Sequence, residues 1–258
     1  MANIEDYQDE INQAYYKEFL AQYNNAKGDK EGTNCPICHN KGYILTGITE
    51  NGPIYKTCQC MNGRNAELRA QQSGLGDRLS KCRFTTYKRN AMWQVQIYDT
   101  AYKSQYGGNG FFIGGKSGSG KTHICVALMQ SMMDKGRQCR YVGWQDLATS
   151  LKQNEYGNSD EYVDTMEKIK KADVLFIDDL YRTNVTDADR RMLFSIIDYR
   201  YNQVEGGKKL FTIISSEKFL DEIKKIDEAI GRRIEALTEG YAVNVPREER
   251  YKYKKGEK

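Results

Sequence analysis

This chain has 258 residues, of which 39% are hydrophobic and 29% charged, and its formal net charge is +4 at pH 7. Its length allows one sizeable core with a small appendage, and its mean hydropathy of −0.76 favours a soluble protein over a membrane-embedded one. There is no apolar run of about 18 residues and no export signal at the start, so we expect a cytoplasmic protein with no membrane partner. Seven cysteines, an odd number, argue against a disulfide framework.

The first element expected along the chain is an amphipathic helix. Apolar and aromatic side chains recur there at helical spacing until the polar stretch 24–29: Ile4, Tyr7, Ile11, Tyr15, Phe19, Leu20 and Tyr23. An aromatic stripe of this kind either docks in a groove of a partner protein or packs against its own chain. The residues leave both alternatives open.

Four of the seven cysteines follow in one short segment: Cys35, Cys38, Cys58 and Cys60. Between the two pairs, the short β-type runs 43–46 and 54–57 flank a turn signal at 50–53, and the hairpin they predict would return the second pair to the first. Four thiolates suit a tetrahedral Zn²⁺ ion, and no open coordination position is implied, so we predict a structural zinc in a small mini-domain. The second pair is CxC rather than CxxC, and His39 could replace one cysteine.

The segment after this hairpin is rich in basic residues. Between residues 64 and 89, only Glu67 and Asp77 oppose seven cationic side chains: Arg64, Arg69, Arg78, Lys81, Arg83, Lys88 and Arg89. Such a segment contacts a phosphate backbone or an acidic partner, or it is simply a solvated surface. Charge distribution alone does not decide between these alternatives.

An intact phosphate-binding motif, GxxxxGK[ST], spans Gly115–Thr122. A strand-like run, 110–113, precedes it and a helical run continues to about Met133, which is the context that the motif requires. Its glycines let backbone N–H groups approach phosphate oxygens, Lys121 would reach the β- and γ-phosphates, and Thr122 would bind Mg²⁺. The residues predicted to bind ATP or ADP are Gly115, Lys116, Ser117, Gly118, Ser119, Gly120, Lys121, Thr122 and His123.

A second nucleotide motif comes where four apolar residues, 174–177, lead directly into Asp178 and Asp179. The run indicates a strand buried on both faces that ends in carboxylates, which is the Walker B pattern. We predict that Asp178 holds Mg²⁺, directly or through water, and that Asp179 polarises the attacking water. Between the two motifs the sequence predicts a strand over 138–144 and helices over 145–153 and 160–171.

A further apolar strand is expected over 209–215, after a helix over 187–204. In P-loop enzymes with an extra strand between the two Walker motifs, a polar residue at this strand end senses the γ-phosphate. Ser216 and Glu217 are the candidates. Ser216 could equally be the N-cap of the helical run that follows it.

The order of these motifs resembles that of the DnaC/DnaI-type helicase loaders and their bacteriophage homologues, AAA+ ATPases related to the IstB transposition helpers. The resemblance runs from about Cys35 to Val245. Beyond the Walker motifs it is carried by CPxC…CxC, Ser73-Gly-Leu75…Phe84-Thr-Thr-Tyr87, Phe194…Ile197-Asp-Tyr-Arg200-Tyr, Ile214-Ser-Ser-Glu217 and Ala229-Ile-Gly-Arg-Arg233-Ile. It implies an α/β fold: a P-loop AAA+ core, with a mainly parallel sheet between helices, preceded by the zinc-binding mini-domain.

The resemblance also implies an arginine finger that acts on a neighbour's γ-phosphate, and it favours Arg233 for this role, although the residues alone favour a solvated or salt-bridged pair for Arg232 and Arg233. Most loaders of this type have Asn where Glu217 stands, and many AAA+ enzymes have Glu where Asp179 stands. We therefore expect slow or partner-dependent hydrolysis. Only 13 residues follow Val245, too few for a C-terminal helical lid. We expect no lid and an ATP site that self-association completes.

These inferences divide the chain into an N-terminal helix and zinc-binding, partner-interaction domain at 1–72, a basic linker at 73–109 and an AAA+ ATPase core at 110–258. The resemblance implies an ATP-dependent loader that places a replicative hexameric helicase on single-stranded DNA. Two alternatives stay open: an IstB-like ATPase helper of a transposase, and an ATP-binding adaptor with negligible turnover.

Overall fold

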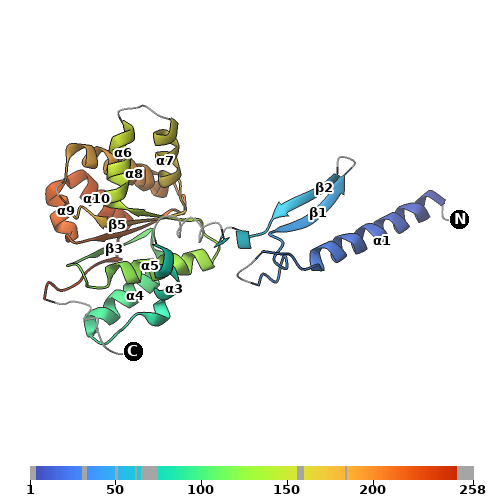
Figure 1. Cartoon of the computed structure of the whole chain (residues 1–258), viewed down its shortest axis with the longest axis horizontal. Coiled ribbons are helices and arrows are strands. Elements are labelled where there is room, and N and C mark those ends of the chain that lie inside the picture. The colour runs from blue at the N-terminus through green and yellow to red at the C-terminus, as the bar shows by residue number, and fades with distance from the viewer. Residues whose placement is uncertain are drawn as a thin grey trace. The chain divides into compact units, whose positions relative to one another are not determined.

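The computed structural model describes residues 4–30, 34–49, 52–61, 63–64, 75–155, 160–183 and 185–248. The chain divides into two compact units, Met1–Arg64 and Asn65–Lys258, and Figure 1 labels helices and strands of both. Within the part of the chain that is described, no helix is long and apolar enough to cross a membrane.

Among its described residues, the first unit contains a long helix and a β-hairpin, as the sequence predicts, and residues 60–61 and 63–64 are also helical. Helix α1 spans Ile4–Asn25, and strands β1 (Tyr43–Thr49) and β2 (Gly52–Thr57) pair antiparallel. The C-terminal part of α1 packs on the hairpin: the Ile48 N–H donates to the Tyr16 hydroxyl at 2.7 Å, and the Tyr23 and Tyr55 rings lie 5.7 Å apart. Packing within the unit therefore uses part of the aromatic surface of α1.

Other aromatic residues of α1 stay in contact with solvent. Tyr15 is 73% exposed and Phe19 is 42% exposed. The side chains of Ile4, Tyr7 and Ile11, which belong to the predicted apolar stripe, lie outside the described residues. Of the two alternatives for the stripe, packing holds for Tyr23, while Tyr15 and Phe19 are available to a partner.

A five-stranded parallel sheet forms the centre of the second unit. Its spatial order is β4-β5-β6-β3-β7, so that β6 lies between the strand that precedes the P-loop and the strand that carries Asp178. This confirms the predicted α/β architecture with a parallel sheet. The strand bounds are β3 Gly110–Gly114, β4 Cys139–Gly143, β5 Val174–Leu180, β6 Phe211–Ser216 and β7 Ala242–Asn244.

Helices cover both faces of this sheet (Figure 1). Because side chains alternate along a strand, Phe176 of β5 joins a buried cluster with α3, α4 and α5, while the adjacent Ile177 joins a second cluster with helices α6 to α10. The helices are α3 Gly76–Lys81, α4 Met92–Gly107, α5 Lys121–Asp134, α6 Trp144–Glu155, α7 Asp160–Lys170, α8 Asp187–Glu205, α9 Leu220–Ile226 and α10 Glu228–Leu237, with a 3₁₀ turn, η2, at Phe84–Thr86.

The segment 73–109, expected as a basic linker, contributes to this core. Leu75 at the N-cap of α3, Leu79 within α3, and Ile97 and Ala101 of α4 are buried in the same cluster as residues of the P-loop helix α5. The functional division at residues 72 and 109 stays a prediction. In the structure, α3 and α4 support the sheet face on which α5 lies.

Candidate nucleotide-binding site

The loop between β3 and α5 has the backbone shape that a phosphate cradle requires. Gly118 and Gly120 have φ angles of +77° and +87°, in the left-handed region that favours glycine. The loop delivers Lys121 to the first position of α5, where the side chain is only 5% exposed. Its Nζ donates to the carbonyl oxygens of Gly115 at 2.7 Å and Lys116 at 3.0 Å, which holds the ammonium group inside the loop.

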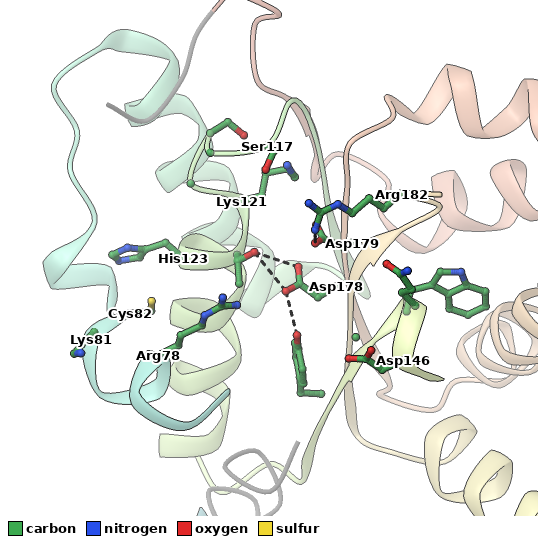
Figure 2. Close-up of a pocket in the computed structure, with 18 residues that line it drawn as sticks. Arg78, Lys81, Cys82, Ser117, Lys121, His123, Asp146, Asp178, Asp179 and Arg182 are labelled. Atoms are coloured by element: carbon green, nitrogen blue, oxygen red, sulfur yellow. Dashed lines mark hydrogen bonds and ion pairs between the residues drawn. The ribbon is translucent and has the colours of Figure 1, made fainter. Parts of the chain in front are cut away.

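A pocket of about 670 Å³ opens beside this loop (Figure 2). The P-loop residues 117–122 form one wall, and Asp178 and Asp179 from the end of β5 form another. The Ser119 hydroxyl is buried and has no hydrogen-bond partner among the described residues, and the N-terminus of α5 presents backbone N–H groups here. Such a donor set suits the phosphates of a nucleotide, because free N–H and O–H groups at a helix N-terminus bind anions.

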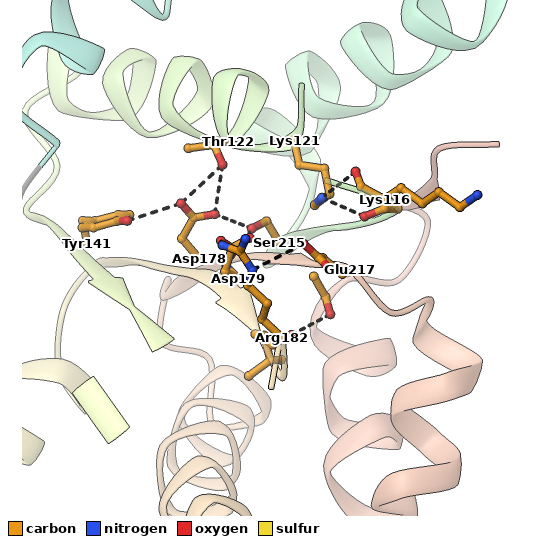
Figure 3. Close-up of polar contacts among 12 residues, drawn as sticks. Lys116, Lys121, Thr122, Tyr141, Asp178, Asp179, Arg182, Ser215 and Glu217 are labelled. Atoms are coloured by element: carbon orange, nitrogen blue, oxygen red, sulfur yellow. Dashed lines mark hydrogen bonds and ion pairs between the residues drawn. The ribbon is translucent and has the colours of Figure 1, made fainter. Parts of the chain in front are cut away.

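Asp178 is held among three hydroxyl groups at the carboxyl end of β5 (Figure 3). Thr122 Oγ1 donates to its Oδ1 at 3.3 Å, the Tyr141 hydroxyl donates to its Oδ2 at 3.3 Å, and the Ser215 hydroxyl also donates to Oδ1. Burial raises the pKa of Asp178, and these hydrogen bonds act in the opposite direction. The carboxylate and the Thr122 hydroxyl are the oxygen ligands that Mg²⁺ prefers, so these residues fit a magnesium ion that accompanies the nucleotide.

Asp179 follows in a local irregularity of β5. The register between β5 and β6 shifts between Ile177 and Leu180, and Asp179 itself has a left-handed φ of 54°. Its N–H donates to Ser215 Oγ at 3.0 Å, and its Oδ2 accepts from Arg182 Nη1 at 3.0 Å. The bulge therefore fixes the Asp179 backbone and leaves its carboxylate paired with a cation.

Ser216 and Glu217 do not share the environment of Asp178. The Ser216 hydroxyl donates to the Leu180 carbonyl at 2.7 Å and accepts the Lys218 N–H at 3.0 Å. The N-cap of α9 is Phe219 rather than Ser216. Glu217 Oε1 lies 3.5 Å from Arg182 Nε. The hydroxyl at the end of β6 that contacts Asp178 is that of Ser215, one residue before the predicted candidate.

The adjacent arginines of α10 lie apart from the pocket. Arg233 Nε donates to Asp198 Oδ1 at 2.7 Å, and its guanidinium lies 4.8 Å from the Phe194 ring centroid. Arg232 pairs with Glu228. Among the described residues, those that line the pocket do not include either arginine. The finger role expected for Arg233 therefore requires a second subunit and stays a prediction.

His123 connects the P-loop helix to the segment before it. Its Nε2 lies 3.2 Å from Thr86 Oγ1 and 3.3 Å from the Arg83 carbonyl oxygen, and its ring meets Tyr87 edge-on at 5.4 Å. Burial lowers the pKa of His123, which favours the neutral imidazole. His123 also borders the pocket, and its role in nucleotide binding stays a prediction.

Several residues at the site were not predicted from the sequence, among them Arg78, Tyr141, Arg182 and Ser215. Arg78 reaches from α3 into the pocket in Figure 2, and Tyr141 comes from β4, the strand paired with β5. Knowledge of the strand order would have revealed Tyr141 and Ser215, since both lie at the carboxyl ends of strands that neighbour β5. No local pattern marks Arg182.

The cysteine cluster of the first unit brings four sulfur atoms together. The Sγ atoms of Cys35, Cys38, Cys58 and Cys60 all lie within 4.8 Å of one another. The Gly42 N–H donates to Cys38 Sγ at 3.3 Å; burial alone would raise the pKa of Cys38, but this bond and the neighbouring thiols lower it to about 6. Four sulfur ligands and a backbone N–H donor suit a closed tetrahedral zinc site, and His39 is not in this group.

Several known proteins are similar in sequence to this chain. A family model described as an IstB-like ATP binding protein matches residues 106–228. The uncharacterized protein YqaM of Bacillus subtilis is 30% identical over 204 residues, which cover 73% of this chain and 62% of YqaM. The phage-like element PBSX protein XkdC of the same organism is 26% identical over 238 residues, 84% of each chain. The replicative helicase loader DnaC of Escherichia coli is 21% identical over 199 residues, 74% of this chain and 77% of DnaC.

Solved structures show the same fold. A crystal structure of the DnaC helicase loader matches with a TM-score of 0.56 at 22% identity, covering 66% of this chain and 99% of that one. AMPPCP-bound DnaA from Aquifex aeolicus matches with a TM-score of 0.55 at 18% identity, and the match covers 64% of this chain and 50% of DnaA. A crystal structure of DnaI matches with a TM-score of 0.54 at 19% identity, and the match covers 66% of this chain and 93% of that one. These similarities confirm the predicted AAA+ fold.

Proposed function

We propose that this chain is an ATPase switch that loads a replicative hexameric helicase onto single-stranded DNA. Its residues 106–228 match the model of IstB-like ATP binding proteins. Binding of ATP would favour assembly with the helicase, and hydrolysis would favour release. The zinc-binding first unit would contact the helicase, and the second unit would bind the nucleotide.

The observation that carries the proposal is the assembly of both Walker motifs around one pocket. Lys121 and Thr122 come from the start of α5, and Asp178 and Asp179 come from the end of β5, two strands away from β3 in the sheet. The loop residues 115–120 would bind the phosphates through backbone N–H groups, Lys121 would contact the β- and γ-phosphates, and Thr122 and Asp178 would hold Mg²⁺. The metal would neutralise phosphate charge during transfer to water.

Hydrolysis requires a group that orients water at the γ-phosphate. Asp179 borders the pocket and would take this role once its carboxylate is separated from Arg182. Aspartate is one methylene shorter than glutamate, and in this structure its carboxylate is ion-paired. For both reasons, we expect the isolated chain to hydrolyse ATP slowly and a partner to increase the rate. Arg233 from a neighbouring subunit would add charge stabilisation through self-association.

Support for a loader comes from the first unit and from the relatives. The cysteine cluster fits Zn²⁺, which would stabilise a unit whose described residues include few buried apolar side chains beyond the cysteines, and Tyr15 and Phe19 of α1 are exposed. The loader DnaC matches along 74% of this chain. The alternative of an IstB-like transposase helper is favoured by one specific observation, the family model that matches residues 106–228.

Nucleotide binding and hydrolysis are separated by comparing Lys121→Ala with Asp179→Asn. Lys121→Ala should weaken binding of Mg·ATP at least tenfold, because it removes a charged contact to phosphate worth about 1.5–3 kcal/mol. Asp179→Asn should retain ATP and lose turnover. A chain that binds ATP and shows no turnover with any partner, in the wild type as in Asp179→Asn, would instead be the ATP-binding adaptor.

The partner is identified by co-purification with replicative helicases, with and without ATP, and in parallel with a transposase. We expect retention of a hexameric helicase that depends on ATP, and single-stranded DNA recovered with the complex. Capture of the transposase together with duplex DNA, and of no helicase, would favour the IstB-like alternative.

A further inference from the structure

Arg182 connects two carboxylates, that of Asp179 at the candidate nucleotide pocket and that of Glu217 beside the outer part of the phosphate loop. Its Nη1 lies 3.0 Å from Asp179 Oδ2, and its Nε lies 3.5 Å from Glu217 Oε1 (Figure 3). Asp179 is on β5, and Glu217 follows β6, so one guanidinium bridges two neighbouring strand ends. The side chain is 49% exposed and borders the nucleotide pocket.

This end of the site is crowded with acidic groups. Asp178, Asp179 and Glu217 all act electrostatically on Lys121. Glu217 also borders a hollow beside Lys116, Ser117 and Gly118, the outer part of the phosphate loop. A γ-phosphate placed at Lys121 would therefore meet carboxylates as well as cations, and Arg182 is the guanidinium that offsets two of those carboxylates.

We propose that Arg182 is a γ-phosphate sensor within the same chain, which exchanges its ion pair with Asp179 for contact with the γ-phosphate and so releases Asp179 to orient water. This inference rests on the proposed ATPase function and adds the means by which ATP is distinguished from ADP. Without a γ-phosphate, Arg182 holds the Asp179 carboxylate in an ion pair. With a γ-phosphate, the guanidinium gains a more highly charged partner in the same pocket.

The geometry permits this exchange at small energetic cost. Arg182 is three residues beyond Asp179, and a half-exposed ion pair contributes little to folding, so the guanidinium can change partner without disturbing the core. Lys121, by comparison, is buried and bound to two backbone carbonyls, which suits a fixed phosphate ligand rather than a sensor. The planar guanidinium also offers two parallel N–H donors, which match phosphate oxygens.

The test compares the affinities of the full chain for Mg·AMPPNP and Mg·ADP by isothermal titration calorimetry. For Arg182→Gln we expect AMPPNP binding to weaken about tenfold or more, from loss of a charge-assisted contact and from an uncompensated Glu217, while ADP binding stays within about twofold. Adding Glu217→Gln to Arg182→Gln should recover at least about threefold of the AMPPNP affinity, because it removes that carboxylate. Arg232→Gln, the same change at an ion pair outside the pocket, should alter neither affinity.

Equal weakening of AMPPNP and ADP binding by Arg182→Gln, no change in either, or no recovery with Glu217→Gln would overturn the sensor role. ADP binding by the variant also shows that it is folded. The proposed function fails separately, if the wild type binds neither nucleotide or if Lys121→Ala binds both as the wild type does.

Discussion

The side-chain oxygen of Ser215 accepts the backbone N–H of Asp179 at 3.0 Å. The same hydroxyl donates its proton to the carboxylate of Asp178. One buried side chain on β6 therefore holds both the bulged backbone of β5 and the carboxylate expected to bind magnesium. The positions of the predicted metal ligand, Asp178, and of the predicted water-orienting group, Asp179, are thus coupled through a single serine.

Replacing Ser215 with alanine should affect catalysis more than stability. The change removes a donor to a charged group and frees the Asp179 N–H in a bulge, and we expect ATP turnover to fall by about tenfold or more. Ser216→Ala is the matched control. It leaves the Leu180 carbonyl and the Lys218 N–H without their partner and should lower the free energy of unfolding by about 1–3 kcal/mol, with turnover of the folded protein nearly unchanged. Turnover assays measure the effect on catalysis, and urea unfolding measures the effect on stability. If Ser216→Ala lowered turnover and Ser215→Ala did not, Ser216 would again be the candidate γ-phosphate sensor.

Stability of the metal-free protein should depend on pH through Asp178. Burial raises the pKa of this group in the folded chain above its ordinary value, so the folded chain binds a proton where the unfolded chain does not. The stabilisation from the protonated form is present at low pH and is lost as the pH rises through the raised pKa. Asp178→Asn does not titrate, so its advantage in free energy of unfolding over the wild type should grow as the pH rises above about 4, the ordinary pKa of an aspartate. Urea unfolding in EDTA across this range gives the difference, and a constant difference would contradict the expectation.

Arg200 should be among the most sensitive positions of the core. Its guanidinium is fully buried and donates to Thr212 Oγ1 at 2.8 Å and to the carbonyls of Lys170, Ala172 and Phe211 at 3.0, 2.7 and 2.8 Å. Arg200→Met leaves these acceptors unpaired, and we expect a loss of about 3–5 kcal/mol in the free energy of unfolding. Lys168→Ala, which removes an exposed ion pair with Asp164, should change it by about 0.5 kcal/mol at most. Similar urea midpoints for the two variants would refute this view of Arg200.

Strands β5 and β6 show how much of the fold and of the site can be predicted from the sequence. Apolar runs that end in polar groups predict both strands, and the glycines before Lys121 predict the loop, because these signals are local. The roles of Ser215 and Ser216 depend on which face each side chain occupies. Neighbouring residues on a strand point to opposite faces of the sheet, and the bulge at Asp179 changes the register of β5 opposite Ser215 and Ser216. An error of one residue in the predicted register therefore places the wrong serine beside Asp178. Arg182 could not be predicted because its partners, Asp179 and Glu217, meet only in the folded sheet.

Removing the metal should affect the first unit alone. We expect one zinc ion per chain by elemental analysis, and its loss in Cys38→Ser or after chelation should make residues 34–64 sensitive to protease, because closed thiolate sites supply much of the folding free energy of small units. Binding of Mg·ADP should stay within about twofold. Cys82→Ala, at a half-buried cysteine of the second unit, should retain zinc. Zinc retained in Cys38→Ser, or protease resistance that survives chelation, would exclude a structural zinc.

Helicase binding should depend on the exposed aromatic residues of α1. The double variant Tyr15→Ser, Phe19→Ser removes apolar surface without touching the Tyr16 and Tyr23 contacts that hold α1 on the hairpin. We expect it to lose co-purification with the helicase, since truncation of an aromatic anchor at an interface costs about 2 kcal/mol or more, while zinc content and ADP binding are preserved. Tyr102→Ser is the matched control, at an aromatic residue of α4 that is 42% exposed in the second unit. If the double variant binds the helicase as the wild type does, the partner surface lies elsewhere, and α1 serves only to support the hairpin.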